Sequence, residues 1–470
     1  MMTNFIAVID IGKTNAKVAI VDKENWSEIA VRTTPNSVLN KAPYPHFDIE
    51  GLWKFIVQSL HALNDSHPIS AISITTHGAS AVLLDNDGQL ALPMLDYEHD
   101  GPVATKPTYQ KIRPDFEETG SPELPLGLNL GAQLFWQQTL FAKEFSQVQS
   151  IVTYPQYWAF RLTGVLATEV TSLGCHTDLW NPWENKLSSL CTLTGWGKLL
   201  APIRKANDIL GTITPKIASE TGISANVPVY CGIHDSNASL YPNLRQRKGP
   251  FSVVSSGTWV ICMAIEGNNI KPDPARDTLV NVSAFGDAVP SARFMGGREY
   301  DLLLQGQTAD CSNNDIATVL EKKIYLLPAA ENRSGPFQGY GQKWLGDEPA
   351  DGVRYAAISF YLAMMTSVCL NLIGAQGPII VEGPFSRNRP FLDMLSAATQ
   401  GPVIAASKSA TGTSIGAAML SADDSAIAKL NSAKSEQEID CTQSNHLNSY
   451  ADSWHEAVRN MKRKPSSTFT

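Results

Sequence analysis

The sequence lacks any pair of cysteines at the short spacing that metal sites and redox motifs use. Its seven cysteines are scattered through 470 residues, with no CxxC pair and no matching Cys/His pattern. An odd, scattered set is typical of reduced thiols, because disulfides are rare in the cytoplasm. We therefore expect a cytoplasmic protein whose cysteines are mostly small core residues.

Positive charge is also scarce. The formal net charge is −8, and the lysines and arginines do not gather in one stretch. A surface that binds nucleic acid needs a basic patch, so we expect no nucleic-acid partner. Any anionic ligand must then be bound by local geometry.

Long uncharged runs are nearly absent. One stretch, residues 355–375, carries no charge over a length that could span a bilayer. Its Ser, Thr, Asn and Tyr residues favour a buried helix, so we expect no membrane association. The opening "MMTNFIAVID" has no basic region, and its apolar run ends at Asp10, which indicates a first strand rather than a signal peptide.

The composition, 43% hydrophobic and 17% charged, is that of a globular protein, and the length predicts two sizeable domains. The stretch "FIAVIDIGKTNAKVAIVD" predicts two strands joined by a tight turn, with a third strand after it. Leu52, Ile56 and Leu60 then recur at helical spacing, and "ISAISITTHGAS" predicts a buried strand. Strands alternating with helices predict an α/β sheet domain.

Residues 251–265, "FSVVSSGTWVICMAI", repeat the opening pattern of Phe, apolar strand, small glycine turn and returning strand. Two hairpins of one design, half a chain apart, predict two domains of related fold that face each other. The alternative is that any two hairpins look alike; the glycine-and-hydroxyl turn in both copies favours the first interpretation.

The turn of the first hairpin carries groups that bind phosphate. Backbone N–H groups at a tight glycine turn can converge on an anion. The residues that we expect to contact a nucleotide here are Asp10, Gly12, Lys13, Thr14, Asn15 and Lys17. Asp10 would repel a phosphate unless a cation lay between them. A Mg²⁺–nucleotide supplies such a cation, because Mg²⁺ binds both carboxylates and phosphate oxygens. Many exposed hairpins carry such residues, so the motif alone is weak.

The second turn supplies a partner for the first. Ser256, Gly257 and Thr258 would form a second phosphate-binding turn, with the triphosphate between the two hairpins. The alternative is an ordinary turn beside a buried Trp259.

A third feature, "VPVYCGIHDSNASLY", runs from an apolar strand through His234 and Asp235 into a helix of small residues. Asp235 could simply cap that helix. It could also be a general base that takes a proton from a hydroxyl as the oxygen attacks phosphorus. Its place upstream of the second turn favours the second role.

Together, "DIGKTNAK", "TTHGASAVLLD", "YWAFRLTGVLATEVTSLG", "GIHDSNAS", "SSGTW" and "TGTSIGAAML" resemble the FGGY family of carbohydrate kinases, over about residues 5–422. The resemblance implies two ribonuclease-H-like, actin-like ATPase domains flanking a nucleotide and sugar cleft. It implies ATP, Mg²⁺ and transfer of the γ-phosphate to a sugar hydroxyl. The expected ranges are 1–245 for a sugar-binding domain, 246–440 for a nucleotide-binding domain and 441–470 for a polar tail.

Residue by residue, Asp10 matches the family's aspartate near Mg²⁺, and Asp235 matches its catalytic base, with both as candidate metal ligands. Gly257 and Thr258 match the second phosphate loop. The adenosine segment of the family has a glycine run followed by Asn; here it reads Glu-Gly-Pro, so the run is broken while Gly383 and Asn388 keep their places.

For the sugar, the resemblance implies contacts from the first domain. The candidates are His77, Gly78, Asp96, Glu98, His234 and Asp235. A turn histidine bonded to backbone is the alternative for His77. A solvated acidic loop is the alternative for Asp96 and Glu98.

The motifs are most similar to those of rhamnulokinases and related deoxyketose kinases. L-Rhamnulose is the expected substrate, with L-fuculose, xylulose or ribulose as alternatives. Two other classes remain open: a chaperone-like or filament-forming ATPase, and a sugar sensor that has lost catalysis. The sequence leaves the oligomeric state open, a homodimer included.

Overall fold

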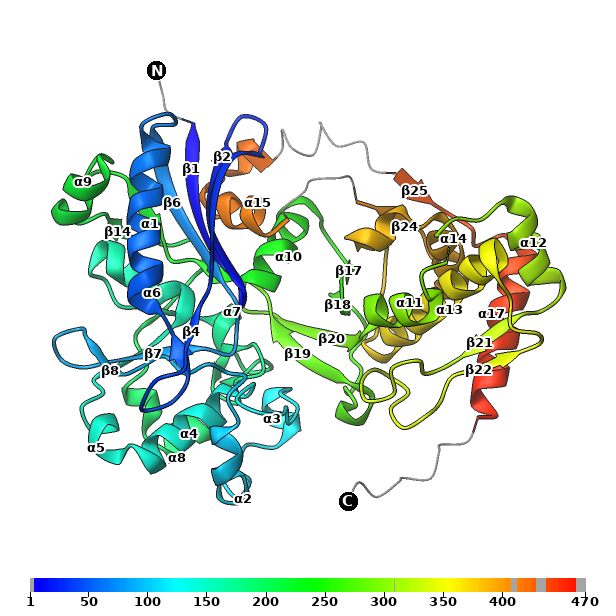
Figure 1. The fold of residues 1–470 in the computed structure, drawn as a ribbon, viewed down its shortest axis with the longest axis horizontal. Coiled ribbons are helices and arrows are strands. Elements are labelled where there is room, and N and C mark those ends of the chain that lie inside the picture. Colours follow the sequence, from blue (N-terminus) through cyan, green and yellow to red (C-terminus); the bar gives the residue numbers. More distant parts are fainter. Residues whose placement is uncertain (1–3, 308, 407–411, 428–436, 462–470) are drawn as a thin grey trace. The chain divides into compact units, whose positions relative to one another are not determined.

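The computed structural model describes residues 4–307, 309–406, 412–427 and 437–461. Internal contacts divide the chain into two compact units (Figure 1). Unit 1 comprises Met1–Gln246, Val280–Ala288 and Ser409–Ala433, and unit 2 comprises Arg247–Leu279, Val289–Lys408 and Lys434–Thr470. The expected ranges, 1–245, 246–440 and 441–470, are single stretches, whereas two segments of the expected second range, Val280–Ala288 and Ser409–Ala433, belong to unit 1, and the expected tail belongs to unit 2.

Unit 1 is built on a seven-stranded sheet. Its strands, in spatial order, are β14 (Ile209–Thr212), β15 (Pro228–Tyr230), β6 (Ile69–Thr76), β1 (Phe5–Ile11), β2 (Asn15–Asp22) and β3 (Ser27–Pro35), with β16 (Ile233–His234) also paired to β6. The neighbours β1, β2 and β3 are antiparallel, and β1 is parallel to β6. The expected strand–turn–strand therefore forms, with Asp10 opposite Lys17 in register.

The helices of unit 1 are α1 (Ile49–Asn64), α4 (Leu130–Leu140), α6 (Tyr154–Thr163), α9 (Pro215–Thr221), α10 (Asp235–Gln246) and α15 (Gly412–Ala418), with the short α2 (Lys106–Tyr109), α3 (Phe116–Thr119), α5 (Ala142–Phe145), α7 (Val170–Leu173) and α8 (Ser189–Leu193). Among them α1, α6, α10 and α15 pack on this sheet. In α1, Asp48 caps the first turn by accepting from the Gly51 N–H at 2.9 Å, and Leu52, Ile56 and Leu60 are buried as the spacing predicted.

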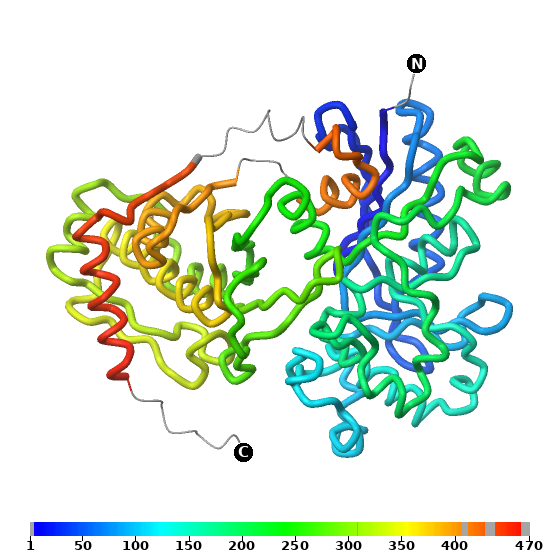
Figure 2. The backbone as a smooth tube through the Cα atoms, turned by 180° about the vertical axis from the view of Figure 1, so that it is seen from behind, coloured from blue at the N-terminus to red at the C-terminus, as the bar shows by residue number. Residues whose placement is uncertain are grey.

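Smaller elements complete unit 1. They are the sheets β8 (Leu90–Leu92)–β7 (Ala81–Leu84)–β9 (Ser150–Thr153), β4 (Val38–Leu39)–β5 (His46–Phe47), β10 (Thr168–Glu169)–β13 (Ile203–Arg204) and β11 (Trp180–Asn181)–β12 (Lys186–Leu187), and the 3₁₀ turns η1 (Gly101–Thr105), η2 (Trp196–Lys198) and η5 (Met419–Ser421). Figure 2 shows α15, in orange, beside the blue strand β1, more than half the chain away in sequence.

Unit 2 repeats the pattern. Its sheet has the order β19 (Thr278–Val282), β20 (Ala288–Phe294), β18 (Val260–Ile265), β17 (Phe251–Ser256), β23 (Ile379–Glu382), β24 (Val403–Ala405) and β25 (Gln437–Ile439). Here β17 is antiparallel to β18 and parallel to β23, as β1 is to β2 and β6. An antiparallel hairpin followed by a parallel strand is thus present twice, which confirms the two related folds that the repeated hairpins predicted and the ribonuclease-H-like arrangement that the family resemblance implied.

The remaining elements of unit 2 are α11 (Gly296–Leu304), α12 (Asn313–Glu321), α13 (Asp351–Leu372), α14 (Arg389–Thr399), α17 (Asn445–Arg459), η3 (Pro274–Arg276), η4 (Pro384–Arg387) and the hairpin β21 (Tyr325–Leu327)–β22 (Lys343–Leu345). By length and composition α13 could cross a membrane, but 83% of its most apolar window is buried inside the protein. That burial is typical of a core helix, as expected from the uncharged stretch.

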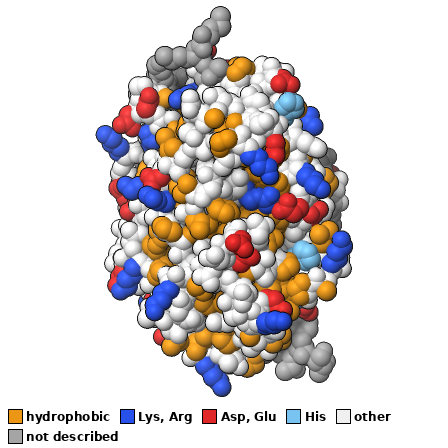
Figure 3. Space-filling view, turned by 90° about the vertical axis from the view of Figure 1, so that its left-hand side faces the viewer, with side chains coloured by type: hydrophobic (Ala, Val, Ile, Leu, Met, Phe, Trp, Pro, Cys, Tyr) orange, Lys and Arg blue, Asp and Glu red, His pale blue; other side chains and the backbone are white. Residues whose placement is uncertain are grey.

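The surface and the cysteines agree with the composition. On the face of unit 1 in Figure 3, Lys and Arg side chains are interspersed with Asp and Glu. All seven cysteines are free thiols, and five of them are buried.

Candidate active site

Asp235 is the first residue of helix α10 and directly follows the short strand β16. Its Oδ1 accepts hydrogen bonds from the Ser236 N–H at 2.6 Å and the Ser236 hydroxyl at 3.3 Å, and lies 3.1 Å from His234 Nε2. No described residue hydrogen-bonds Oδ2, and the side chain is 34% exposed. Loss of hydration raises the pKa of Asp235, while the neighbouring His77 lowers it. One oxygen is thus held in place and the other is available to a ligand.

His234 lies beside the Asp235 carboxylate. Its Nδ1 lies 3.4 Å from the Asn237 amide nitrogen, which can only donate, so the neutral ring carries its proton on Nε2, which lies 3.6 Å from Cys175 Sγ and 3.1 Å from Asp235 Oδ1. Burial lowers the pKa of His234 to about 4, which keeps the ring neutral. Its backbone N–H donates to the Thr171 hydroxyl at 3.0 Å.

Gly78 permits this arrangement. A Cβ at position 78 would lie 2.8 Å from His234 Nε2 and 3.1 Å from Cys175 Sγ. Any larger residue would displace the buried imidazole. The structure therefore gives Gly78 a packing role beside His234.

His77 follows strand β6 and is 6% exposed. Its Nδ1 donates to the Gly78 carbonyl at 2.9 Å, which leaves Nε2 as an acceptor, and Nε2 is buried with no partner among the described residues. The rings of Phe47, Tyr97 and Tyr154 surround it at centroid distances of 5.3, 5.3 and 5.0 Å. Burial lowers its pKa to about 4. A buried, neutral acceptor without a partner is suited to a ligand hydroxyl.

Asp10 is the last residue but one of strand β1, and its carboxylate interacts with that of Asp235. Burial raises its pKa from 3.8 to about 6; Lys17 lowers it and the Asp235 carboxylate raises it. Lys17 Nζ lies 3.5 Å from Asp10 Oδ2, and the Ser414 hydroxyl donates to the same oxygen at 3.5 Å. Two carboxylates that repel each other are a donor set that fits Mg²⁺, which takes one or two carboxylates and completes its shell with phosphate oxygens and water.

The turn between β1 and β2 offers fewer free donors to a phosphate than its sequence suggested. The Gly12 N–H donates to the Asn15 carbonyl at 2.9 Å, closing the turn, while Thr14 and Asn15 are exposed. Lys17 pairs with Glu28 at 3.3 Å as well as with Asp10. Lys13 turns toward another loop of unit 1: its ammonium pairs with Asp96 and lies 3.4 Å from Glu98.

Unit 2 contains a separate cavity of about 410 Å³, a size that accepts a nucleoside. Its lining residues are Gly257, Thr258, Gly297, Tyr300, Asp301, Tyr355, Pro384, Phe385, Arg387 and Asn388. Of the expected nucleotide residues in this unit, the structure brings Gly257, Thr258 and Asn388 to the cavity wall.

The other two expected nucleotide residues of this unit, Ser256 and Gly383, are next in sequence to the lining residues Gly257 and Pro384. The Ser256 hydroxyl donates to the Glu382 carbonyl at 2.5 Å and accepts from the Phe385 N–H at 3.0 Å. Gly383 has φ +78°, and a Cβ there would lie 1.9 Å from the Ser256 carbonyl. The glycine preserved in the broken run is therefore required where the loop crosses strand β17.

Sequence reasoning missed several cavity residues. Tyr300 and Phe385 have ring centroids 6.1 Å apart, and Gly297 lies so close to the Gly257 carbonyl that a Cβ would come within 2.1 Å. The paired glycines of "FMGGREYD" could have indicated this close contact between two backbone segments. Asn388 also caps α14, accepting from the Phe391 N–H at 3.0 Å.

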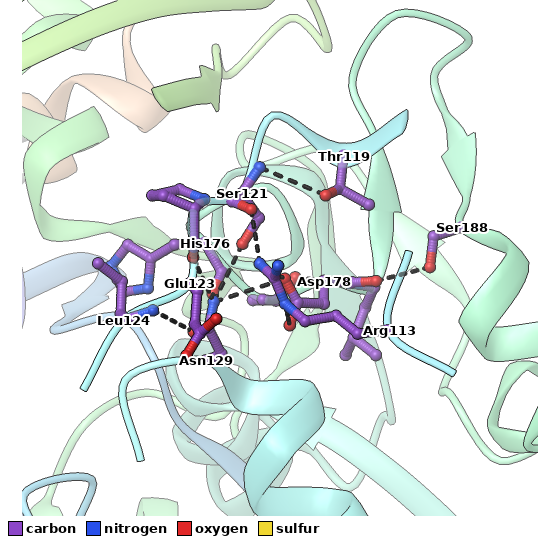
Figure 4. Close-up of polar contacts among 12 residues, drawn as sticks. Arg113, Thr119, Ser121, Glu123, Leu124, Asn129, His176, Asp178 and Ser188 are labelled. Carbon is purple, nitrogen blue, oxygen red and sulfur yellow. Dashed lines mark hydrogen bonds and ion pairs between the residues drawn. The ribbon is translucent and has the colours of Figure 1, made fainter. Parts of the chain in front are cut away.

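A second cavity, of about 250 Å³, lies in unit 1 beside a buried polar network (Figure 4). Arg113 Nη2 donates to Asp178 Oδ1 at 2.9 Å and to the Ser121 carbonyl at 2.7 Å, and the Asn129 amide donates to the Ser121 hydroxyl at 3.1 Å. These bonds hold the segment 119–129, and Gly127 of that segment donates its N–H to the Tyr97 carbonyl at 2.9 Å. The network thus supports the loop that carries Tyr97.

Comparisons with known proteins agree with the two units. Residues 5–241 match the N-terminal domain of the FGGY family of carbohydrate kinases, and residues 248–429 match the C-terminal domain of carbohydrate kinase FGGY. A carbohydrate kinase from Novosphingobium aromaticivorans has a similar structure, with a TM-score of 0.86 and 33% identity, over 96% of this chain and 100% of that one.

Two curated relatives are similar in sequence. One is an L-fuculokinase of Salmonella typhi, 25% identical over 57% of this chain and 58% of the relative. The other is a probable L-xylulose kinase of Pasteurella multocida, 26% identical over 49% of this chain and 50% of the relative. The chain spans about half the length of the curated relatives it matches. With both domain families matched in order along two ribonuclease-H-like units, this chain belongs to the FGGY family of carbohydrate kinases.

Proposed function

We propose that this protein is an ATP-dependent kinase that transfers the γ-phosphate of Mg-ATP to a hydroxyl of a small ketose. The observation that carries the proposal is the Asp235 carboxylate, whose Oδ1 is held by Ser236 while Oδ2 has no partner among the described residues. A general base needs such a free oxygen in a fixed position.

Each residue then has a role in the reaction. His77 Nε2 accepts a hydrogen bond from a sugar hydroxyl and orients the sugar. Asp235 Oδ2 takes the proton from the hydroxyl that attacks the γ-phosphorus. Ser236 keeps the carboxylate oriented by donating its N–H and hydroxyl to Oδ1, and the neutral His234 ring lies beside it.

The adenosine of the nucleotide is assigned to unit 2, and its phosphates to the Mg²⁺ ion. The 410 Å³ cavity of unit 2 would take the adenosine, with Thr258 near the phosphates. Asp10 would hold Mg²⁺, because the free oxygen of Asp235 is assigned to the proton transfer. When bound, the ion neutralises charge on the phosphate oxygens.

The ketose is the finer part of the proposal. The matched relatives are an L-fuculokinase and a probable L-xylulose kinase, which favours L-fuculose and L-xylulose over L-rhamnulose. Few polar contacts decide between such sugars.

The test is a coupled ADP-release assay with Mg-ATP against L-fuculose, L-xylulose, L-rhamnulose, D-xylulose and D-ribulose, with glycerol as a contrast. We expect ADP release that depends on one or two ketoses. Equal ADP release without any sugar would instead favour an ATPase, and sugar binding without ADP release would favour a sensor.

A further inference from the structure

Lys13 occupies an unexpected place for a residue of the phosphate-binding turn. Its Nζ lies 4.8 Å from the Phe47 ring centroid and 4.9 Å from the Tyr97 ring centroid, and pairs with Asp96. The same two rings pack around His77, at 5.3 Å each. The ammonium therefore belongs to the aromatic surroundings of His77.

Moving this ammonium to a phosphate would be costly. The side chains of Lys13 and Asp96 are only 19% and 11% exposed, so breaking their pair would leave a carboxylate unpaired in a poorly hydrated place. The ammonium would also lose its contacts with both ring faces. The neighbouring Glu98, 3.4 Å away, adds to the attraction.

The pair also fixes which oxygen of Asp96 is available. Oδ1 accepts from the Lys13 ammonium and from the Glu98 N–H at 3.1 Å. Oδ2 has no partner among the residues that the structure describes. Lys13 thus holds Asp96 with one oxygen free, just as Ser236 holds Asp235.

We propose that Lys13 is a specificity-determining residue of the sugar site: it orients Asp96 toward a sugar hydroxyl and is not a ligand of the triphosphate. This inference rests on the proposed function, because it assumes that a sugar binds beside His77. It deepens that function by naming a residue that positions the sugar.

The charges around His77 indicate the class of substrate. Besides burial, three carboxylates, those of Asp96, Glu98 and Asp235, raise the pKa of the neighbouring Tyr97. One ammonium, that of Lys13, adds to burial in lowering the pKa of His77. Negative charge is therefore in excess here. A sugar acid would be repelled by the excess of negative charge. A neutral polyhydroxy ketose can donate its hydroxyls to these carboxylates.

The experiment compares Lys13→Met with the wild type. Methionine keeps an apolar stem over the two rings and removes the ammonium. We expect the KM for the preferred ketose to rise about tenfold or more, the size expected for loss of a charged hydrogen-bonding group. We expect the Kd for Mg-ATP without sugar, measured by calorimetry, to stay within about twofold. Lys13→Arg, which keeps the charge, should recover part of the sugar KM.

Lys17→Met is the matched control, because Lys17 lies in the same hairpin and pairs with Asp10 and Glu28. It should weaken Mg-ATP binding more than it changes the sugar KM. A Lys13→Met variant that bound Mg-ATP tenfold more weakly, or kept the wild-type sugar KM, would overturn the inference. So would equal rises of the sugar KM in both variants.

Failure of the proposed function is visible separately, in the wild type. A wild-type chain that phosphorylated no sugar would contradict that function. The titration of Mg-ATP without sugar would still show whether Lys13 contacts the triphosphate.

Discussion

At the scale of single residues, the candidate site depends on groups that are held by one atom and free at another. Asp235 is held at Oδ1, His77 at Nδ1 and Asp96 at Oδ1. Each leaves one atom for a ligand. Such preorganisation lowers the cost of orienting groups when the substrate binds.

Asp235→Asn tests the role of the free oxygen. Asparagine keeps an oxygen at the Oδ1 position but cannot take a proton, so we expect kcat to fall by at least ~10²-fold. Fluorescent-nucleotide binding should remain. Asp65→Asn, at an exposed position after α1, is the control and should leave kcat unchanged. Turnover retained in the Asp235 variant would remove the residue from the role of base.

Gly78→Ala tests the packing beside His234. The added methyl would lie 2.8 Å from Nε2, so the ring must shift from its place beside Asp235 Oδ1. We expect a loss of about 1–3 kcal/mol in the free energy of unfolding and a lower kcat. Gly211→Ala, where the nearest atom would be 3.6 Å away, is the matched control. Equal stabilities and rates in the two variants would contradict this packing role.

At the scale of elements, the start of α7 supports the start of α10. The Glu169 carboxylate accepts from the Thr171 N–H at 3.0 Å and from its hydroxyl, and that hydroxyl accepts from the His234 N–H. Glu169 is fully buried, and burial raises its pKa to about 7. A fixed chain of hydrogen bonds thus joins two helix starts that are more than sixty residues apart.

Unit 2 has a similar buried carboxyl in α11, that of Glu299, and we expect it to make the free energy of unfolding depend on pH. Glu299 accepts from the Glu331 N–H at 2.9 Å and from the Tyr361 hydroxyl at 2.8 Å, and burial raises its pKa from 4.5 to about 7. Between these values the folded state binds more protons than the unfolded state. The free energy of unfolding should therefore fall as pH rises from 4.5 to 7, by up to about 3 kcal/mol from this group.

Glu299→Gln should remove this part of the pH dependence. Thermal unfolding at pH 5 and pH 8 measures it: the variant should lose less stability than the wild type between the two. Glu321→Gln, at an exposed position of α12, should keep the wild-type dependence. An identical pH profile in the Glu299 variant would show that the carboxyl ionises freely in the fold.

At the scale of the whole molecule, one hairpin-and-strand plan serves two ligands. In unit 1 the end of β1 carries Asp10 and the loop after β6 carries His77; in unit 2 the turn after β17 and the loop after β23 line the 410 Å³ cavity. The proposed function divides the sugar and the nucleotide between these two sets of strand ends.

Hydrogen exchange read by mass spectrometry tests this division. Mg-ATP alone should slow amide exchange in 256–258, 297–301 and 384–388, because a bound nucleotide restrains the loops that contact it. The preferred ketose alone should slow exchange in 77–79 and 96–98. Helix α17, which lines neither site, is the internal control. No slowing in 384–388 with Mg-ATP would contradict the assignment of the cavity.

Local pattern was enough to predict much of this protein. The strands around Asp10, the repeat at residues 251–265 and the buried, uncharged helix all follow from the spacing of apolar residues and turn residues, which acts between near neighbours in sequence. The ordered motifs were enough to predict the family, which both matched domains confirm.

The partners of the polar side chains depended on the fold. Lys13 pairs with Asp96, 83 residues away, and Gly383 is needed because a loop crosses Ser256, 127 positions earlier. A charged side chain has no periodicity that reveals its partner, and its preferred contact depends on burial and on which loops the sheet brings together. The sequence therefore predicts that Lys13 stands at a functional turn, and the packing of unit 1 determines that its ammonium lies beside His77.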